Sequence, residues 1–476
     1  MSFHHPLYLA GTFLSTESSK VVINPFTGES IARVSLADEH LWEKAIQKAY
    51  QSFQQTRHLS SYQKYKILSQ IVASIESQKE ELALLISQES AKPYKYAIAE
   101  VLRAIQTFTI AAEESKRIPY EYFDLDSTPE QMARAGVVKR FPVGVVLAIT
   151  PFNFPLNLVA HKLAPAIASG CPFILKPSSN TPLTALKLAE IIQQTEWPKE
   201  AASVLPSSSA VVEKFLTHPH IATISFTGSP SVGWKIKSLA PRKKITLELG
   251  GNAATIITES ADISQIIEHC VVAGFAYSGQ ICIHTQRFLV HPKHFDAFAE
   301  VFTRQVQQLK FGNPLDPTTD ISVMIDEENA IRTETWVYEA IQQGAQYLLK
   351  GYREKNYHAP VILTHTNSSM KVYAEEVFAP VVCVEKYDGS IQDAVRRVND
   401  SKYGLQCGVF TNHIKELHYC FEHIECGAVL HNACSVLRLD AMPYGGVKES
   451  GFGREGIKYS ILEMTEPKLL LKDESI

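Results

Sequence analysis

Strand-length apolar segments alternate with segments of helical periodicity along most of this 476-residue chain. Such alternation predicts an α/β fold with largely parallel sheets. Between residues 143 and 240 we expect strands at 143–149, 172–176 and 222–226, and helices at 157–169, 182–193 and after Gly228. A second series follows Gly251, with strands at 253–257 and 288–291 and helices at 263–278 and 293–309. The first series has the layout of half of a nucleotide-binding domain.

Two segments lie outside this alternation. Residues 119–140 are polar and contain prolines, and residues 135–141 alternate in polarity, which favours an extruded hairpin. The tail at 469–472 could supply a strand to something outside the main fold. Together these segments suggest an oligomer contact, and a hairpin packed on its own chain is the alternative.

Composition limits the kinds of partner. The net charge is −4, with no block of like charges. Neither nucleic acid nor a membrane is expected, since both binding modes need a basic or strongly apolar face. No apolar stretch reaches the length of a membrane span, and the N-terminus lacks the pattern of a secretory signal. The length favours two or more domains.

The eight cysteines are scattered, without a Cys-x-x-Cys pair or a Cys/His set with zinc-ligand spacing. No metal site is therefore predicted, and the thiols indicate a reduced, cytoplasmic protein. Seven are most simply core residues. Cys282 differs because it ends Ser278-Gly-Gln-Ile-Cys282, in which Gly279 fits a sharp turn, and because Glu248 stands upstream in Leu247-Glu-Leu-Gly-Gly251.

A thiol, a carboxylate and an amide donor are the parts needed to capture a carbonyl as a covalent adduct. The amide candidate is Asn153, which follows the strand at 143–149 and could donate to an oxyanion or simply cap the next helix. Lys176 also ends a strand and suits ribose or phosphate, although lysines are mostly exposed. Gly228-Ser229 opens a helix whose free amides attract phosphate, without the Gly-x-Gly-x-x-Gly pattern.

These motifs occur in the order found in NAD(P)-dependent aldehyde dehydrogenases, and the chain resembles that superfamily over nearly its whole length. The matching segments are Pro151–Pro155, Lys176–Ser178, Phe226–Ser229, Leu247–Gly251, Gly279–Cys282, Glu375–Pro380, Tyr403–Leu405 and Pro443–Gly451. Residues 156–162 and 438–446 resemble the branch that contains lactaldehyde, semialdehyde and non-phosphorylating glyceraldehyde-3-phosphate dehydrogenases.

The resemblance implies a Rossmann-like coenzyme domain (1–118 and 142–250), an α/β catalytic domain (251–447) and a small β oligomerisation arm (119–141 and 466–476), with 448–465 returning towards the coenzyme domain. It implies a homodimer or homotetramer. Cys282 would be the nucleophile, and Asn153 with the Cys282 amide would form the oxyanion hole. Glu248 would activate the water that hydrolyses the thioester.

The same resemblance implies NAD or NADP as hydride acceptor. Lys176 would hold the adenosine ribose, Ser229 the pyrophosphate and Glu376 the nicotinamide ribose, with Phe378 against the nicotinamide. The residues expected at the coenzyme are Thr150, Pro151, Phe152, Lys176, Ser178, Ser179, Gly228, Ser229, Leu249, Gly250, Glu376 and Phe378. Ser179 replaces a glutamate of many NAD-preferring relatives, which removes repulsion against a 2′-phosphate, so NADP should be tolerated.

The expected aldehyde pocket departs from that of relatives with apolar substrates. His161 and Arg438 occupy positions that are aromatic there, and Arg103 is expected at the same mouth, with Ile281, Ile283 and Tyr444 as further lining. Semialdehyde dehydrogenases that bind a carboxylate resemble this chain in carrying a cation at the His161 position. Arginine forks suit carboxylate, phosphate or sulfonate, which predicts a small polar or anionic aldehyde. The alternative is that Arg438 pairs with Asp440 or another acid and never meets substrate.

Two other functions compete with hydrolytic aldehyde oxidation. A CoA-acylating relative would pass the acyl group to a thiol instead of water, and Glu248 argues against it because water activation is what that residue serves. A catalytically inactive structural or binding homologue is disfavoured by the intact Asn153, Glu248 and Cys282.

Overall fold

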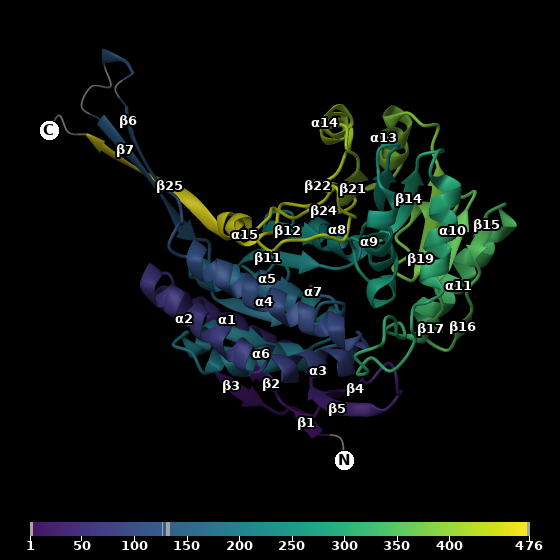
Figure 1. Cartoon of the computed structure of the whole chain (residues 1–476). Helices are drawn as coiled ribbons and strands as arrows, with labels where there is room; N and C mark the ends of the chain where they lie inside the picture. The colour runs from purple at the N-terminus through teal and green to yellow at the C-terminus, as the bar shows by residue number, and fades with distance from the viewer. Residues whose placement is uncertain (1–2, 126, 130–133, 474–476) are drawn as a thin grey trace.

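The computed structural model describes residues 3–125, 127–129 and 134–473 (Figure 1). An eight-stranded sheet runs in the order β24-β12-β11-β8-β9-β10-β2-β3, with β12 to β10 parallel and β24, β2 and β3 antiparallel. Its strands are β2 Leu7–Leu9, β3 Thr12–Leu14, β8 Val145–Ile149, β9 Phe173–Lys176, β10 Ala202–Val204, β11 Ile221–Thr227, β12 Lys244–Glu248 and β24 Gly451–Phe452.

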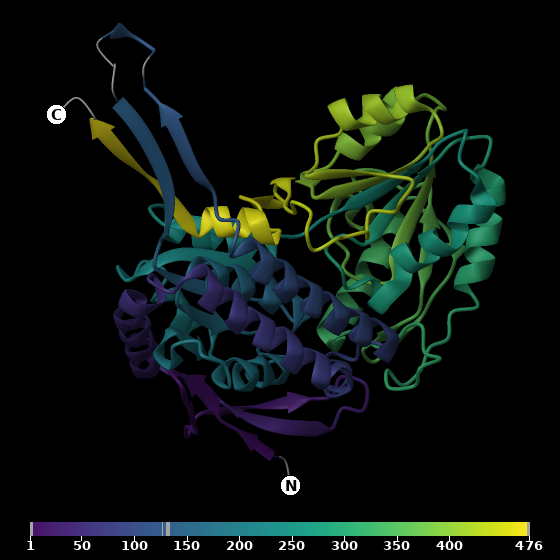
Figure 2. The same ribbon diagram turned by 60° about the vertical axis from the view of Figure 1, so that its left-hand side comes forward.

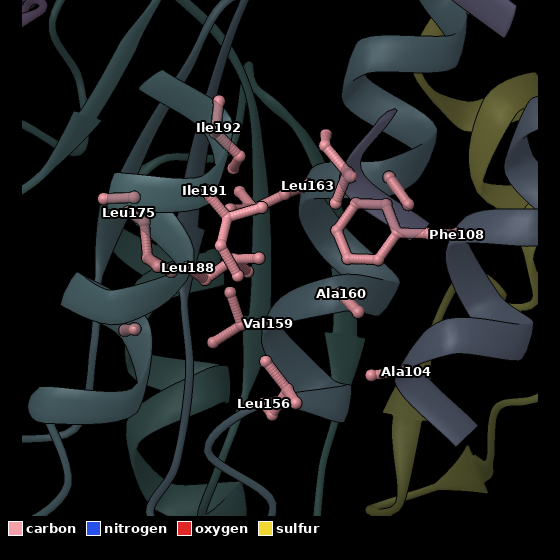
Figure 3. Packing of buried hydrophobic residues seen from close by; sticks show 14 of the residues in the cluster. Ala104, Phe108, Leu156, Val159, Ala160, Leu163, Leu175, Leu188, Ile191 and Ile192 are labelled. Carbon is pink, nitrogen blue, oxygen red and sulfur yellow. The ribbon is translucent and has the colours of Figure 1, made fainter. Parts of the chain in front are cut away.

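Helices cover both faces of this sheet. They are α1 Glu39–Thr56, α2 Ser61–Ser77, α3 Lys79–Ser90, α4 Tyr94–Glu114, α5 Asn157–Ser169, α6 Leu183–Gln193, α7 Ser209–Glu213, α8 Pro230–Leu239 and α15 Ile457–Glu463, with a 3-10 turn at Lys199–Ala201. Alternate residues of β8 enter different cores: Val146 packs with α4, α5 and α6, whereas Leu147 packs with α1 and α8. Figure 3 shows the first core, where Phe108 lies against α5 and α6 contributes Leu188 and Ile191.

A seven-stranded sheet, β15-β18-β19-β14-β13-β21-β22, forms the second body and is parallel except for β15. Its strands are β13 Ala253–Ile257, β14 Thr285–Val290, β15 Gln346–Leu349, β18 Val361–Thr364, β19 Val381–Lys386, β21 Gln406–Phe410 and β22 Ala428–His431. Its helices are α9 Ile263–Phe275, α10 Phe295–Val306, α11 Glu327–Gln342, α12 Lys371–Ala374, α13 Ile391–Asn399 and α14 Ile414–His423. Figure 2 shows this body beside the eight-stranded one.

The expected hairpin is present as β6 Tyr120–Asp124 and β7 Arg134–Pro142, and it projects from the molecule (Figures 1 and 2). The tail strand β25 Thr465–Asp473 pairs with β7 from Thr465 opposite Pro142 to Asp473 opposite Arg134. The tail therefore joins the hairpin of its own chain, where the sequence suggested a strand given to something outside the fold. We call this three-stranded sheet the arm.

Smaller sheets complete the fold: β1 Phe3–His5, β5 Ser30–Ser35 and β4 Ser19–Ile23 form one, β16 Arg353–Glu354 pairs with β17 Tyr357–His358, and β20 Tyr403–Gly404 pairs with β23 Val447–Lys448. Within the three described ranges, no helix is long and apolar enough to cross a bilayer.

Most element boundaries lie within a few residues of the expected ones. Helix α5 has the expected limits and ends on Gly170, whose φ of 85° gives the left-handed C-cap. The helix expected at 263–278 instead ends at Phe275, because Tyr277 and Ser278 have φ values of 50° and 53° and cannot continue an α-helix.

Candidate active site

The segment that carries Cys282 is held in an unusual backbone conformation. Tyr277, Ser278 and Gly279 are all left-handed, with φ of 50°, 53° and 69°, in the 3-10 turn Ala276–Gly279. A β-carbon at Gly279 would lie 2.1 Å from the carbonyl oxygen of Ala379, so only glycine fits. The Ser278 hydroxyl donates to the Ser322 carbonyl at 2.7 Å, which fixes the turn before the cysteine.

Asn153 lies next to this segment. It follows β8, is almost fully buried, and donates through Nδ2 to the carbonyl oxygen of Gln280 at 3.0 Å. Because an amide nitrogen carries two hydrogens, the second remains available for another acceptor. The structure therefore places the Asn153 amide against the backbone two residues before Cys282, where the predicted oxyanion hole would lie.

The thiol of Cys282 lies in a small apolar cluster that also contains Ile281, Ile283, Leu405 and Tyr444. Burial raises the pKa of Cys282 to about 11, although the hydrogen bond with Tyr444 and the charge of Arg438 oppose this rise. Of the lining residues expected from the sequence, Ile281, Ile283 and Tyr444 thus surround the thiol.

Glu248 ends β12 and is buried with no hydrogen-bond partner for either carboxylate oxygen among the described residues. A β-carbon at Gly445 would lie 2.8 Å from its Oε1, so the carboxyl group packs against that glycine. Burial, and next the charge of Glu455, raise the pKa of Glu248 well above its usual value. An unpartnered carboxyl group with a raised pKa suits a base that takes a proton from water.

A cavity of about 330 Å³ opens at the carboxyl ends of β8, β9 and β11. Seven of the residues expected at the coenzyme line it: Thr150, Pro151, Lys176, Ser178, Ser179, Gly228 and Ser229. Burial lowers the pKa of Lys176 to about 8, with a smaller contribution from Lys20. Ser229 precedes α8 without capping it through its side chain, which leaves the amides of the helix start available for a phosphate.

The other five expected coenzyme residues do not line this cavity. Glu376 lies across Gly250: a β-carbon there would be 2.5 Å from Glu376 Oε2, and the Gly251 N–H donates to Glu376 Oε1 at 3.0 Å. Burial raises the pKa of Glu376 to about 7. A β-carbon at Gly251 would lie 2.4 Å from the Cys282 carbonyl oxygen, so this group adjoins the nucleophile segment.

Aromatic and apolar packing fixes the remaining members. The rings of Phe152 and Phe378 meet edge to face, with centroids 6.0 Å apart at 83°. Leu249 packs on α8, where a β-carbon at Gly233 would lie 2.3 Å from its Cδ2. Glu376 and Gly250 therefore lie beside the contact between Gly251 and Cys282, Phe152 packs with Phe378, and Leu249 lies against α8.

Asp440 binds two of the side chains expected to meet substrate, Arg103 and His161. Its carboxylate accepts from Arg103 at 2.7 and 3.3 Å and from His161 Nε2 at 2.8 Å. Burial, and next the charge of Arg438, lower the pKa of His161 to about 4. His161 is therefore neutral at neutral pH, which corrects the expectation of a cation there, and the Arg103 fork is occupied by an internal acid.

Arg438 pairs with Glu455, at 3.4 Å, and not with Asp440. Its Nε has no partner among the described residues, and its Cζ lies 3.5 Å from the centroid of the Tyr444 ring. Glu455 also accepts from Lys162 at 2.8 Å. Neither Glu455 nor its pairing with Lys162 was predicted, because the two residues are 293 positions apart and only the tertiary fold brings them together. Lys162 itself lies in a segment that carries the family resemblance.

All eight cysteines are free thiols. Among the residues that the structure describes, no group of three or more His, Cys, Asp or Glu side chains is arranged to hold a metal ion.

Residues 13–470 match the aldehyde dehydrogenase family. The chain is 40% identical over 466 residues to 3-sulfolactaldehyde dehydrogenase of Priestia aryabhattai, covering 98% of this chain and 97% of that one. It is 37% identical over 470 residues to lactaldehyde dehydrogenase of Methanococcus aeolicus, with 98% and 99% covered.

Solved structures agree with this assignment. Aldehyde dehydrogenase 21 of Physcomitrella patens, in complex with the reaction product succinate, superposes with a TM-score of 0.97 at 38% identity, over 100% of this chain and 99% of that one. A glyceraldehyde-3-phosphate dehydrogenase of Methanocaldococcus jannaschii complexed with NADP gives 0.92 at 36% identity, over 96% and 100%. The chain belongs to the aldehyde dehydrogenase family and is an NAD(P)-dependent oxidoreductase that acts on aldehydes.

Proposed function

We propose that this enzyme oxidises a small anionic aldehyde to the carboxylic acid through a thioester on Cys282. The observation that carries the proposal is the convergence of three groups: the Cys282 thiol, the Asn153 amide held against the same segment, and the unpartnered carboxyl group of Glu248. Each supplies one requirement of the reaction, namely a nucleophile, an oxyanion donor and a base for water.

In this proposal the Cys282 sulfur attacks the aldehyde carbon, and the carbonyl electron pair moves to oxygen. Asn153 Nδ2–H and the Cys282 N–H donate to that oxygen. Lys176, Ser229 and Glu376 would hold NAD(P)⁺, which would supply the acceptor for the hydride on the same carbon. Glu248 then takes a proton from water, the hydroxide adds to the thioester, and loss of the thiolate releases the acid.

The surroundings of the coenzyme cavity support the use of both NAD and NADP. Lys176 lies on the cavity with no acidic partner among the described residues, and Ser179 presents a hydroxyl where a carboxylate would repel a 2′-phosphate. We assign Glu376 to the nicotinamide ribose and Phe378 to the nicotinamide side, since the segment that contains both adjoins the Cys282 segment.

We infer that Arg438 binds the negative group of the substrate. Its side chain is only 5% exposed, and its hydrogen bonds to described residues use one of five N–H donors. A buried guanidinium with unused donors favours an anionic ligand. The candidates are aldehydes of the kinds that relatives are named for, such as 3-sulfolactaldehyde, together with lactaldehyde, semialdehydes and glyceraldehyde 3-phosphate.

Replacing Arg438 with leucine should raise KM for an anionic aldehyde about 10- to 100-fold, because a charged hydrogen bond contributes roughly 1.5–3 kcal/mol. The KM for propanal, which has no charge to bind, should change by less than about threefold. Steady-state kinetics with 3-sulfolactaldehyde, succinate semialdehyde and propanal measure the ratio.

Arg103→Leu is the matched control. Its guanidinium is already bound by Asp440, so the variant should affect charged and neutral aldehydes alike. Equal effects of Arg438→Leu on both kinds of aldehyde would show that Arg438 serves only Glu455 and Tyr444.

The reaction type itself is tested by the absorbance of reduced nicotinamide with and without CoA. We expect turnover with both NAD and NADP at saturation, at a rate that CoA leaves unchanged, and a free acid as product. A rate that depends on CoA would favour the acylating alternative. The absence of any turnover across the aldehydes above would favour an inactive homologue, and a failure with NADP alone would contradict the role given to Ser179.

We propose that residues 1–118 and 142–250 bind the coenzyme, that 251–447 carry the catalytic thiol, and that the arm joins copies of the chain into a homodimer or homotetramer. The arm supports this last role by exposing Leu469, Leu470 and Leu471 on β25, each at least half exposed. Eight free thiols support a cytoplasmic location.

A further inference from the structure

The hydroxyl of Tyr444 contacts the thiol of Cys282, with Oη 3.1 Å from Sγ. Tyr444 is buried, and the partly buried Cys282 packs against it in one apolar cluster, where a hydrogen bond to the sulfur is stronger than in open water. The backbone of Tyr444 bonds twice to that of Glu455, at 3.0 and 2.6 Å, which fixes the position of the ring. The backbone pairing of Tyr444 and the turn that carries Cys282 therefore both hold this contact in place.

Arg438 supports this contact by lying over the Tyr444 ring. Its guanidinium carbon lies 3.5 Å from the Tyr444 centroid, and a cation on the ring face stabilises negative charge drawn towards the phenol. Burial raises the pKa of Tyr444 well above its usual value. The phenol thus keeps its proton while the thiol ionises, and towards a thiolate it acts only as a donor.

We propose that Tyr444 is a catalytic residue whose hydroxyl donates a hydrogen bond to the Cys282 thiolate and raises the fraction of reactive anion. The inference rests on the proposed role of Cys282 as nucleophile. The thiol loses its proton to solvent, and the charge on sulfur is stabilised by the Tyr444 O–H. When the sulfur pair forms the bond to the aldehyde carbon, the charge passes to the carbonyl oxygen and the hydrogen bond to sulfur weakens.

The other charged groups that act on this thiol are Arg438, Glu376 and Glu248. Arg438 favours the thiolate, whereas the two carboxyl groups disfavour it. None of these three makes a hydrogen bond to Sγ among the described residues, so Tyr444 is the direct donor whose removal should change thiolate formation most.

The test is the rate of alkylation of Cys282 by iodoacetamide from pH 6 to 10, without coenzyme or aldehyde. In Tyr444→Phe the pKa of the Cys282 thiol should rise by about one unit, the size expected when a hydrogen bond to a charged group is lost. Burial holds this pKa near 11 in the wild type, so the whole pH range lies below it. The rate in the variant should therefore be about threefold lower throughout, because the thiolate becomes about tenfold rarer and about threefold more nucleophilic. Peptide mass spectrometry assigns the alkylated cysteine.

Tyr8→Phe is the matched control, since it removes a buried hydroxyl on β2, in the eight-stranded sheet, and should leave the profile unchanged. 3-Fluorotyrosine at position 444, a stronger donor of nearly the same size, should raise the alkylation rate over the same pH range. An unchanged rate in both Tyr444 variants overturns the proposal. Because alkylation needs no turnover, that result is distinct from failure of Cys282 as nucleophile, which appears as normal turnover in Cys282→Ala.

Discussion

Replacing Glu248 with glutamine lowers steady-state turnover by about 10²- to 10⁴-fold, the usual contribution of a positioned base. The first turnover stays fast, so reduced nicotinamide appears as a burst close to one equivalent per active site. The reason is that glutamine fills the same space against Gly445 but cannot take a proton from water. Stopped-flow absorbance separates the burst from the slow phase.

The pH dependence of the wild type gives a second signature. Burial raises the pKa of Glu248, so the fraction that is ionised and able to act as a base increases as pH rises towards that value. Where hydrolysis limits turnover, kcat should increase with pH over this range in the wild type, and this increase should be absent in Glu248→Gln.

Hydroxylamine provides the control for the Glu248 variant. This nucleophile attacks a thioester without a base, so it should restore turnover and yield a hydroxamate. Loss of the burst together with the steady state would contradict the assignment, because it would place Glu248 in the step before the thioester.

Cys282→Ala should remove the burst and lower turnover by about 10⁴- to 10⁶-fold, as loss of a covalent nucleophile does elsewhere. Without sulfur there is no adduct to hold the carbonyl carbon beside the nicotinamide, so the hydride cannot be transferred. The affinity for NAD and NADP should stay within about twofold, because Cys282 does not line the cavity that contains Lys176 and Ser229. Fluorescence titration of the coenzyme and the burst assay measure both.

Cys426→Ala is the matched control for that variant. Cys426 is the other cysteine that is not fully buried, and its thiol contacts the Ala428 carbonyl oxygen. It should retain activity. A burst that survives in Cys282→Ala would mean that another group attacks the aldehyde.

Local features of this fold could be predicted from the sequence because they depend on neighbouring residues. Apolar periodicity and Gly170 predicted the limits of helix α5, and Gly279 predicted the sharp turn before Cys282. The motif order then placed Asn153 and the Cys282 segment together, and the hydrogen bond from Asn153 to Gln280 agrees with that placement.

The charge of buried side chains and their hydrogen-bond and ion-pair partners could not be predicted, because both depend on which distant residues the fold packs together. The Tyr444–Cys282 contact joins residues 162 positions apart, and the sequence offered no periodic signal for it. His161 looked like a cation by residue type, but the loss of water around it makes the neutral form the stable one. Arg438 pairs with Glu455 and not with Asp440, and this pairing likewise depends on tertiary packing.

The contact of Gly279 with the Ala379 carbonyl oxygen has a consequence for how this protein can be re-engineered. The backbone at Gly279 and the Ala379–Pro380 peptide lie so close together that no methyl group fits between them. Any substitution that moves one therefore displaces the other. Sequence libraries aimed at coenzyme choice and libraries aimed at acyl chemistry should treat residues 277–282 and 376–380 as one inherited unit, exchanged together between relatives.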